Sequence, residues 1–105
     1  MKIPKSVRIS GVEYDVILVP DLNDRLNLLY GEIDHEKCLI KISSTSCESI
    51  HMKCITLLHE ILHGIRNSSG VEIDNEEQIV DMFSRGLYQV LQDNQGRLFG
   101  RNQEE

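Results

Sequence analysis

Residues 56–65 of the chain, Thr-Leu-Leu-His-Glu-Ile-Leu-His-Gly-Ile, place two histidines and a glutamate inside an apolar run. Apolar residues with helical spacing extend the run toward the N-terminus, and together they predict a helix over about residues 47–66. On such a helix His59 and His63 lie on one face, about one turn or roughly 6 Å apart. Glu60 is offset from His59 by about 100° around the helix axis. The run therefore presents two imidazoles side by side, next to a carboxylate.

His-Glu-x-x-His on a helix is the pattern of zinc metalloproteases. Two imidazole nitrogens at this spacing can reach one zinc ion, each at about 2.0–2.1 Å. Glu60 would then activate a zinc-bound water as a general base without being a ligand. The alternative is a metal-free amphipathic helix with two satisfied core histidines. We favour zinc because two histidines and a glutamate inside an apolar run are hard to satisfy without a metal.

Length and charge narrow the classes of protein to consider. A chain of 105 residues is expected to form one domain, residues 1–105. Its net charge of -6 leaves no broad basic stripe, so we expect no direct binding of nucleic acid. No apolar run approaches the ~20 residues of a membrane helix, and no apolar segment of a signal peptide follows the basic start. A location in the cytoplasm is expected.

The three cysteines support the same location. Cys38, Cys47 and Cys54 are an odd number in no paired spacing, which favours reduced thiols in a cytosolic protein. None belongs to a Cys-x-x-Cys pair, so a zinc ribbon is excluded.

The first half of the chain has the alternation of β-strands. Residues 7–19 predict a hairpin that turns at Ser10-Gly11, and residues 30–33 and 38–42 predict a second hairpin around a polar turn. Between the hairpins, a helical spacing of leucines predicts a short helix or turn (Leu22, Leu26 and Leu29). The predicted fold is α+β, with a small antiparallel or mixed sheet packed on two helices.

A second helix should follow the first. Its N-cap is expected at Asp74 or Asn75, and it should continue to about Asp93. The apolar residues expected to pack in it are Ile79, Val80, Met82, Phe83, Leu87, Val90 and Leu91. Residues 94–105 are polar and are expected to form a mobile tail.

A catalytic zinc ion needs a third protein ligand and one open position. Arg66 and Ser69 stand where a metzincin would need Gly and His, so that class is excluded. A gluzincin instead takes a glutamate from a downstream helix, and the candidates are Glu72, Glu76 and Glu77, with Asp74 as a further carboxylate.

Glu77 is the favoured third ligand. Asp81 lies four residues on, on the same face, where it could hydrogen-bond a ligand histidine. Glu76 remains a competitor because it lies over the more apolar face of the helix. In a third interpretation both glutamates only complement the helix dipole.

Residues 38–93 resemble a known family. The Leu-Leu-His-Glu-Ile-Leu-His helix and the later Glu77-x-x-Val80-Asp81-x-Phe83-Ser84 segment look like the ImmA/IrrE-type metallopeptidase domain, whose corresponding segment is Glu-x-x-Ala-Asn-x-Phe-Ala. The small size also resembles the minimal gluzincins. The resemblance implies a Zn²⁺ enzyme in which His59, His63 and Glu77 bind the metal.

The expected function is zinc-dependent hydrolysis of a peptide or protein, with Glu60 as catalytic base. Residues 38–42 are expected to form the edge of the cleft, where an extended substrate could add as a strand. Two alternatives remain: a zinc-bound regulatory or protein-interaction module without turnover, and a metal-free helical adaptor.

Three further features carry weaker expectations. His51 is expected at the surface or in packing rather than as a ligand, and Tyr88 in the core rather than as an oxyanion stabiliser. The minimal gluzincins are associated with latency imposed by a C-terminal segment. Residues 97–105, from the same or a neighbouring molecule, could therefore occlude the cleft.

Overall fold

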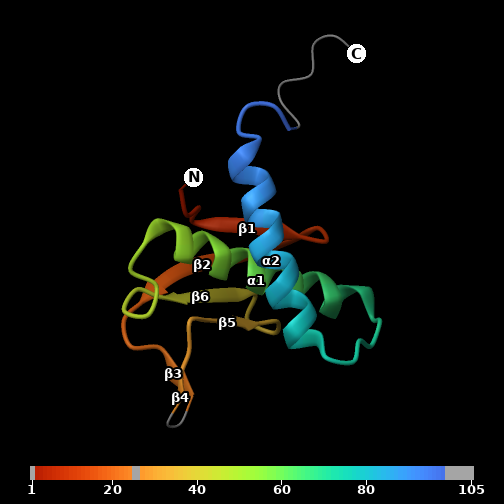
Figure 1. Ribbon diagram of the computed structural model, residues 1–105. Coiled ribbons are helices and arrows are strands. Elements are labelled where there is room, and N and C mark those ends of the chain that lie inside the picture. The colour runs from red at the N-terminus through yellow and green to blue at the C-terminus, as the bar shows by residue number, and fades with distance from the viewer. Residues whose placement is uncertain (1, 25–26, 99–105) are drawn as a thin grey trace.

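The structure is a computed structural model, and it describes residues 2–24 and 27–98. It confirms the predicted α+β class, because the chain combines a mixed sheet of four strands with two helices (Figure 1). A separate ribbon of two short strands projects beyond the sheet (Figure 1). In chain order the elements are β1 (Ser6–Ile9), β2 (Val12–Val19), β3 (Asn23–Asp24), β4 (Asn27–Leu28), β5 (Gly31–Asp34), β6 (Leu39–Ser43), α1 (Ile50–Ser69) and α2 (Glu76–Asp93).

The strand order of the larger sheet is β1-β2-β6-β5. Both predicted hairpins are confirmed, since β1 pairs with β2 and β5 with β6, each antiparallel. β2 and β6 pair in parallel, which makes the sheet mixed. The prediction that residues 38–42 form the cleft edge is wrong: β6 is hydrogen-bonded on both sides, and β5 is the strand at that edge of the sheet.

For the segment between the hairpins the leucine spacing predicts a short helix or turn. Its described residues form the short antiparallel strands β3 and β4 rather than a helix, and Leu26 lies outside the described part. Leu22 is buried, and its carbonyl accepts a hydrogen bond from the Leu29 amide at 3.0 Å. This contact brings the two ends of the segment side by side, which a helix over the same residues would not do.

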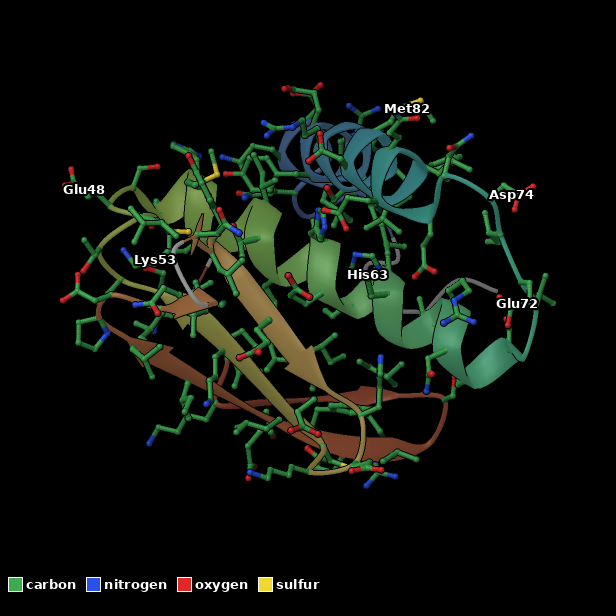
Figure 2. The ribbon with its side chains drawn as sticks, turned by 90° about the horizontal axis from the view of Figure 1, so that it is seen from below. Glu48, Lys53, His63, Glu72, Asp74 and Met82 are labelled. Atoms are coloured by element: carbon green, nitrogen blue, oxygen red, sulfur yellow. The ribbon has the colours of Figure 1, made fainter. Side chains whose placement is uncertain are left out.

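The two helices and the sheet form three layers. α1 covers one face of the sheet, and α2 lies on the side of α1 away from the sheet (Figures 1 and 2). Gly64 of α1 is buried, and a Cβ atom there would come within 2.9 Å of Ile9 Cδ1. The missing side chain therefore lets α1 pack closely on the sheet. The core between them consists of Ile9, Tyr14, Val16, Ile40, Ile42, Cys47 and Leu57.

α1 begins and ends three residues later than predicted, at Ile50 and Ser69. Ser49 is the N-cap, and its side chain accepts a hydrogen bond from the Met52 amide at 3.0 Å. Gly70 ends the helix in the left-handed conformation, with φ of 74°. A connection of five further residues then leads into α2.

The apolar face predicted for α2 is largely wrong. Val80 is buried as expected, but the other buried residues are the small Ser84 and the amphipathic Tyr88. The large apolar residues that stay exposed are Met82, Phe83, Leu87 and Val90. Within the described part of the chain α2 packs on no element other than α1, so a narrow stripe of its surface is enough for the contact.

The described chain ends shortly after α2. The Asn94 carbonyl accepts hydrogen bonds from the amides of Arg97 and Leu98, at 2.9 and 3.1 Å. Residues 99–105 lie outside the described part, and with them most of the predicted tail. Within residues 2–24 and 27–98, neither helix combines the length and the apolar composition that crossing a bilayer requires.

Candidate metal centre

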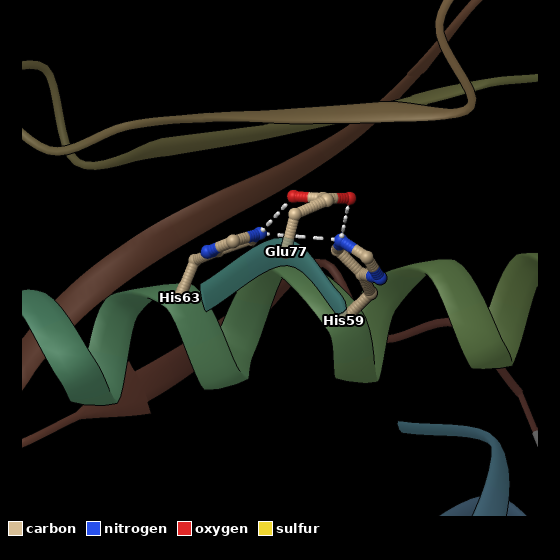
Figure 3. A group of neighbouring side chains, drawn as sticks. All are labelled: His59, His63 and Glu77. Carbon is tan, nitrogen blue, oxygen red and sulfur yellow. Dashed lines mark hydrogen bonds and ion pairs between the residues drawn. The ribbon is translucent and has the colours of Figure 1, made fainter. Parts of the chain in front are cut away.

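Three side chains from two helices meet at one point (Figure 3). His59 and His63 lie one turn apart on α1, and their Nε2 atoms are 3.2 Å apart. Glu77, in the first turn of α2, places Oε2 2.8 Å from Nε2 of His59 and Oε1 2.9 Å from Nε2 of His63. A tetrahedral zinc ion with bonds of about 2.0–2.1 Å keeps its ligand atoms roughly 3.3 Å apart. The three groups could therefore hold a metal ion with small adjustments.

The outer nitrogen of each imidazole faces a carboxylate. His63 Nδ1 lies 2.7 Å from Glu76 Oε2, and His59 Nδ1 lies 3.7 Å from Asp81 Oδ1. An ionised carboxylate only accepts hydrogen bonds, so His63 donates from Nδ1 and turns Nε2 toward His59 and Glu77. Such a carboxylate–histidine arrangement is typical of metal sites.

The donor set suits a divalent cation. Two imidazole nitrogens and a carboxylate oxygen within hydrogen-bond distance of one another need positive charge between them. That charge can come from protons on the imidazoles or from one metal ion. Nitrogen and oxygen donors in this number leave one tetrahedral position open, as a catalytic zinc site requires.

Proton affinities at the site are shifted. Burial would lower the pKa of His63, but its hydrogen bond to Glu76 and the charges of Glu60 and Glu77 raise it above the usual value. The same hydrogen bond from His63 lowers the pKa of Glu76, partial burial opposes this, and Arg66 lowers the pKa further. The site thus favours positive charge on or beside His63.

Glu60 lies on the buried side of α1, and only 6% of the residue is exposed. Burial raises its pKa to about 7; the charge of His63 opposes this shift, while Glu77 and Glu32 add to it. A carboxylate with a pKa near neutrality is well suited to accept and return a proton.

A cleft of about 420 Å³ opens beside these groups. It runs between the start of β5 and the two helices, and Arg85 is the only lysine or arginine among the described residues that line it. The lining residues are Leu28, Leu29, Tyr30, Gly31, Met52, Ile55, Thr56, His59, Glu60, Glu77, Asp81 and Arg85. His59, Glu60 and Glu77 thus face a space large enough for part of a peptide.

Gly31 was not predicted from the sequence, yet it shapes this cleft. A Cβ atom at Gly31 would lie 2.5 Å from Thr56 Cγ2 and 3.1 Å from Glu60 Oε2. The absence of a side chain allows β5 to pass directly against Glu60. The sequence offered one signal, a glycine inside the strand predicted for residues 30–33.

Comparison with protein families, curated proteins and solved structures gave no match. The resemblance to the ImmA/IrrE-type domain and the minimal gluzincins therefore stays a prediction.

The other residues singled out in the sequence lie elsewhere. Glu72 and Asp74 are exposed in the connection before α2, and neither belongs to the group that could hold a metal. His51 is exposed with its ring edge against Tyr88, and its Nδ1 contacts the Tyr88 hydroxyl. Tyr88 is buried, as predicted. The three cysteines, Cys38, Cys47 and Cys54, are all free.

Proposed function

We propose that the chain is a zinc-dependent metallopeptidase, as the sequence pattern predicts. One observation carries the proposal: the Nε2 atoms of His59 and His63 meet the Glu77 carboxylate beside the buried Glu60, in the wall of an open cleft. The free thiols agree with a cytoplasmic location, which we also propose.

Each residue has a separate role in this proposal. His59, His63 and Glu77 would bind the zinc ion. The ion would supply Lewis acidity, which polarises the scissile carbonyl and makes water a stronger acid. Glu60 would take a proton from the attacking water and deliver it to the nitrogen of the leaving amine. In the metal-free chain burial raises the pKa of Glu60 to about 7, which supports its role as a base that also returns the proton.

The substrate is expected to be an extended peptide. β5 is an edge strand, and Gly31 at its start lines the cleft. A peptide could add to this edge through main-chain hydrogen bonds, and its scissile bond would then lie near Glu60. β5 replaces β6 in the role that the sequence had suggested.

The cleft favours turnover over the two alternatives. A structural zinc site is closed by four protein ligands, whereas two of these three ligand groups, His59 and Glu77, border an open cleft. A regulatory module has no need for a general base at this position. In a metal-free adaptor, only protons on the imidazoles could stabilise the contact of the two histidines with Glu77.

Two measurements test the proposal together. Protein purified without added metal should contain one zinc per chain and should cleave members of a peptide library. Glu60→Gln should keep the zinc and lose cleavage, because it removes the base and leaves the ligands in place. A metal-free wild-type protein, or full activity of Glu60→Gln, would show the proposal to be wrong.

A further inference from the structure

The two histidines differ in the contacts that hold their outer ring nitrogens, Nδ1. His63 donates from Nδ1 to Glu76 at 2.7 Å, and Oε1 of Glu76 forms an ion pair with Nε of Arg66 at 3.0 Å, without the geometry of a hydrogen bond. These three side chains are mostly buried, with exposed fractions of 18%, 25% and 22%. They form a continuous chain of guanidinium, carboxylate and imidazole that ends at the candidate metal centre.

A corresponding series of side chains, Asp81 and Arg85, lies beside His59 but makes weaker contacts. Asp81 lies 3.7 Å from His59 Nδ1, which is too long for a hydrogen bond, and Arg85 meets Asp81 at 3.3 Å. Asp81 and Arg85 are 49% and 55% exposed, so water competes for both. The comparison singles out the Arg66 chain as the rigid support.

Arg66 also holds the connection between the helices. Its Nη1 donates to the Val71 carbonyl at 3.2 Å, in the segment that leads into α2. The N-cap of α2, Asn75, is left-handed with φ of 59°, and its side chain makes no capping hydrogen bond. The contacts of Glu76 with Arg66 and His63 therefore substitute for a cap in fixing the first turn of α2, which carries Glu77.

We infer that Glu76 and Arg66 are positioning residues of the metal centre. Glu76 is not a ligand; it holds His63 with Nε2 directed at the metal position. Arg66 holds Glu76, and through Val71 and Glu76 it sets where Glu77 meets the histidines. The inference rests on the metal centre of the proposed function, but it does not depend on turnover.

Zinc affinity, measured by competition with a chromophoric chelator, tests this inference. Loss of an outer partner of a ligand histidine typically weakens metal binding about 10–100-fold. We expect Glu76→Ala and Arg66→Gln to fall in this range. Arg85→Gln, in the series beside His59, should change the affinity less than about threefold. Arg8→Gln, in an exposed ion pair with Glu13 on the first hairpin, is the control for net charge and should have no effect.

Two further variants distinguish a positioning role from a general loss of folded structure. Glu76→Gln keeps an oxygen that can accept from His63 Nδ1, so its zinc affinity should lie between those of Glu76→Ala and the wild type. Arg66→Lys keeps the charge but has one ammonium group for two partners, so it should also be intermediate. Both should match the wild type in circular dichroism, and the cobalt-substituted Glu76→Ala protein should show an altered d–d spectrum.

The outcomes distinguish the inference from the proposed function. If the wild type binds zinc tightly and Glu76→Ala and Arg66→Gln bind it equally well, the positioning roles are wrong and the metal centre stands. If Arg8→Gln or Arg85→Gln weakens binding as much as Arg66→Gln, the effect is one of charge and the inference is also wrong. If the wild type binds no zinc, both the inference and the proposed function are wrong.

Discussion

At the scale of single residues, the burial of Glu60 determines its proton affinity. The folded chain keeps a proton on this carboxyl up to a pH of about 7, whereas the unfolded chain releases it near the usual value of 4.5. Between these values the folded state binds more protons than the unfolded state. Its free energy of unfolding must therefore fall as the pH rises.

The stability of the metal-free protein should therefore depend on pH. After treatment with chelator, wild-type stability should decrease from about pH 4.5 to about pH 7, and Glu60→Gln should lack this contribution. The variant should be the more stable protein at pH 7–8, by up to about 3 kcal/mol. Urea unfolding of both proteins at pH 5, 6, 7 and 8 measures the difference. If the free energies of unfolding of the two proteins change with pH in parallel, Glu60 does not have the raised pKa.

Gly31 allows a second prediction at this scale. Gly31→Ala would drive a methyl group into Thr56 and Glu60, so we expect a loss of about 1–3 kcal/mol in the free energy of unfolding. Gly86→Ala is the matched control, because a Cβ atom at Gly86 meets nothing within 4 Å. In the interior of α2 it should stabilise the protein by about 0.5–1 kcal/mol. Equal stabilities of the two variants would show that the close approach of β5 is not needed.

At the scale of elements, α1 was the part most open to prediction. The positions of His59, Glu60 and His63 on its surface follow from the helical period alone. Gly70 and the apolar run set its extent to within three residues. The choice between Glu76 and Glu77 could not be made this way, because it depends on how α2 is rotated against α1.

The rotation of α2 depends on tertiary contacts that the apolar pattern does not contain. The small Ser84 and the hydroxyl-bearing Tyr88 face α1, while Phe83 and Leu87 remain exposed. The role of Arg66 could not be predicted for the same reason, because it depends on the path of residues 70–75. The edge position of β5 likewise depended on the parallel pairing of β2 with β6.

The dependence of α2 on a single neighbour predicts how it responds to metal. Among the described elements α2 packs on α1 alone, and Glu77 would add a link through zinc. Removal of zinc should therefore speed amide hydrogen exchange in α2 more than in β2 and β6. Zinc at 100 times its dissociation constant stabilises by about 2.7 kcal/mol, so about 100-fold faster exchange is the upper limit. Equal protection of α2 with and without zinc would contradict the link.

At the scale of the whole molecule, metal binding and folding should be coupled. A ligand that binds only the native state raises its stability, so chelator should lower the thermal midpoint of the wild-type protein. His59→Ala should show a midpoint that no longer responds to zinc or to chelator. Differential scanning calorimetry of both proteins provides the measurement. A wild-type midpoint unchanged by chelator would argue against a well-bound metal.

We propose that His59, His63 and Glu77 hold one zinc ion beside Glu60. Anomalous diffraction at the zinc absorption edge, from crystals grown with zinc, would locate this ion. We predict one strong peak at about 2.0–2.1 Å from both Nε2 atoms and from one oxygen of Glu77, with an open position toward the cleft. A peak bound by Glu76 instead, a fourth protein ligand, or no peak between the histidines would contradict the claim.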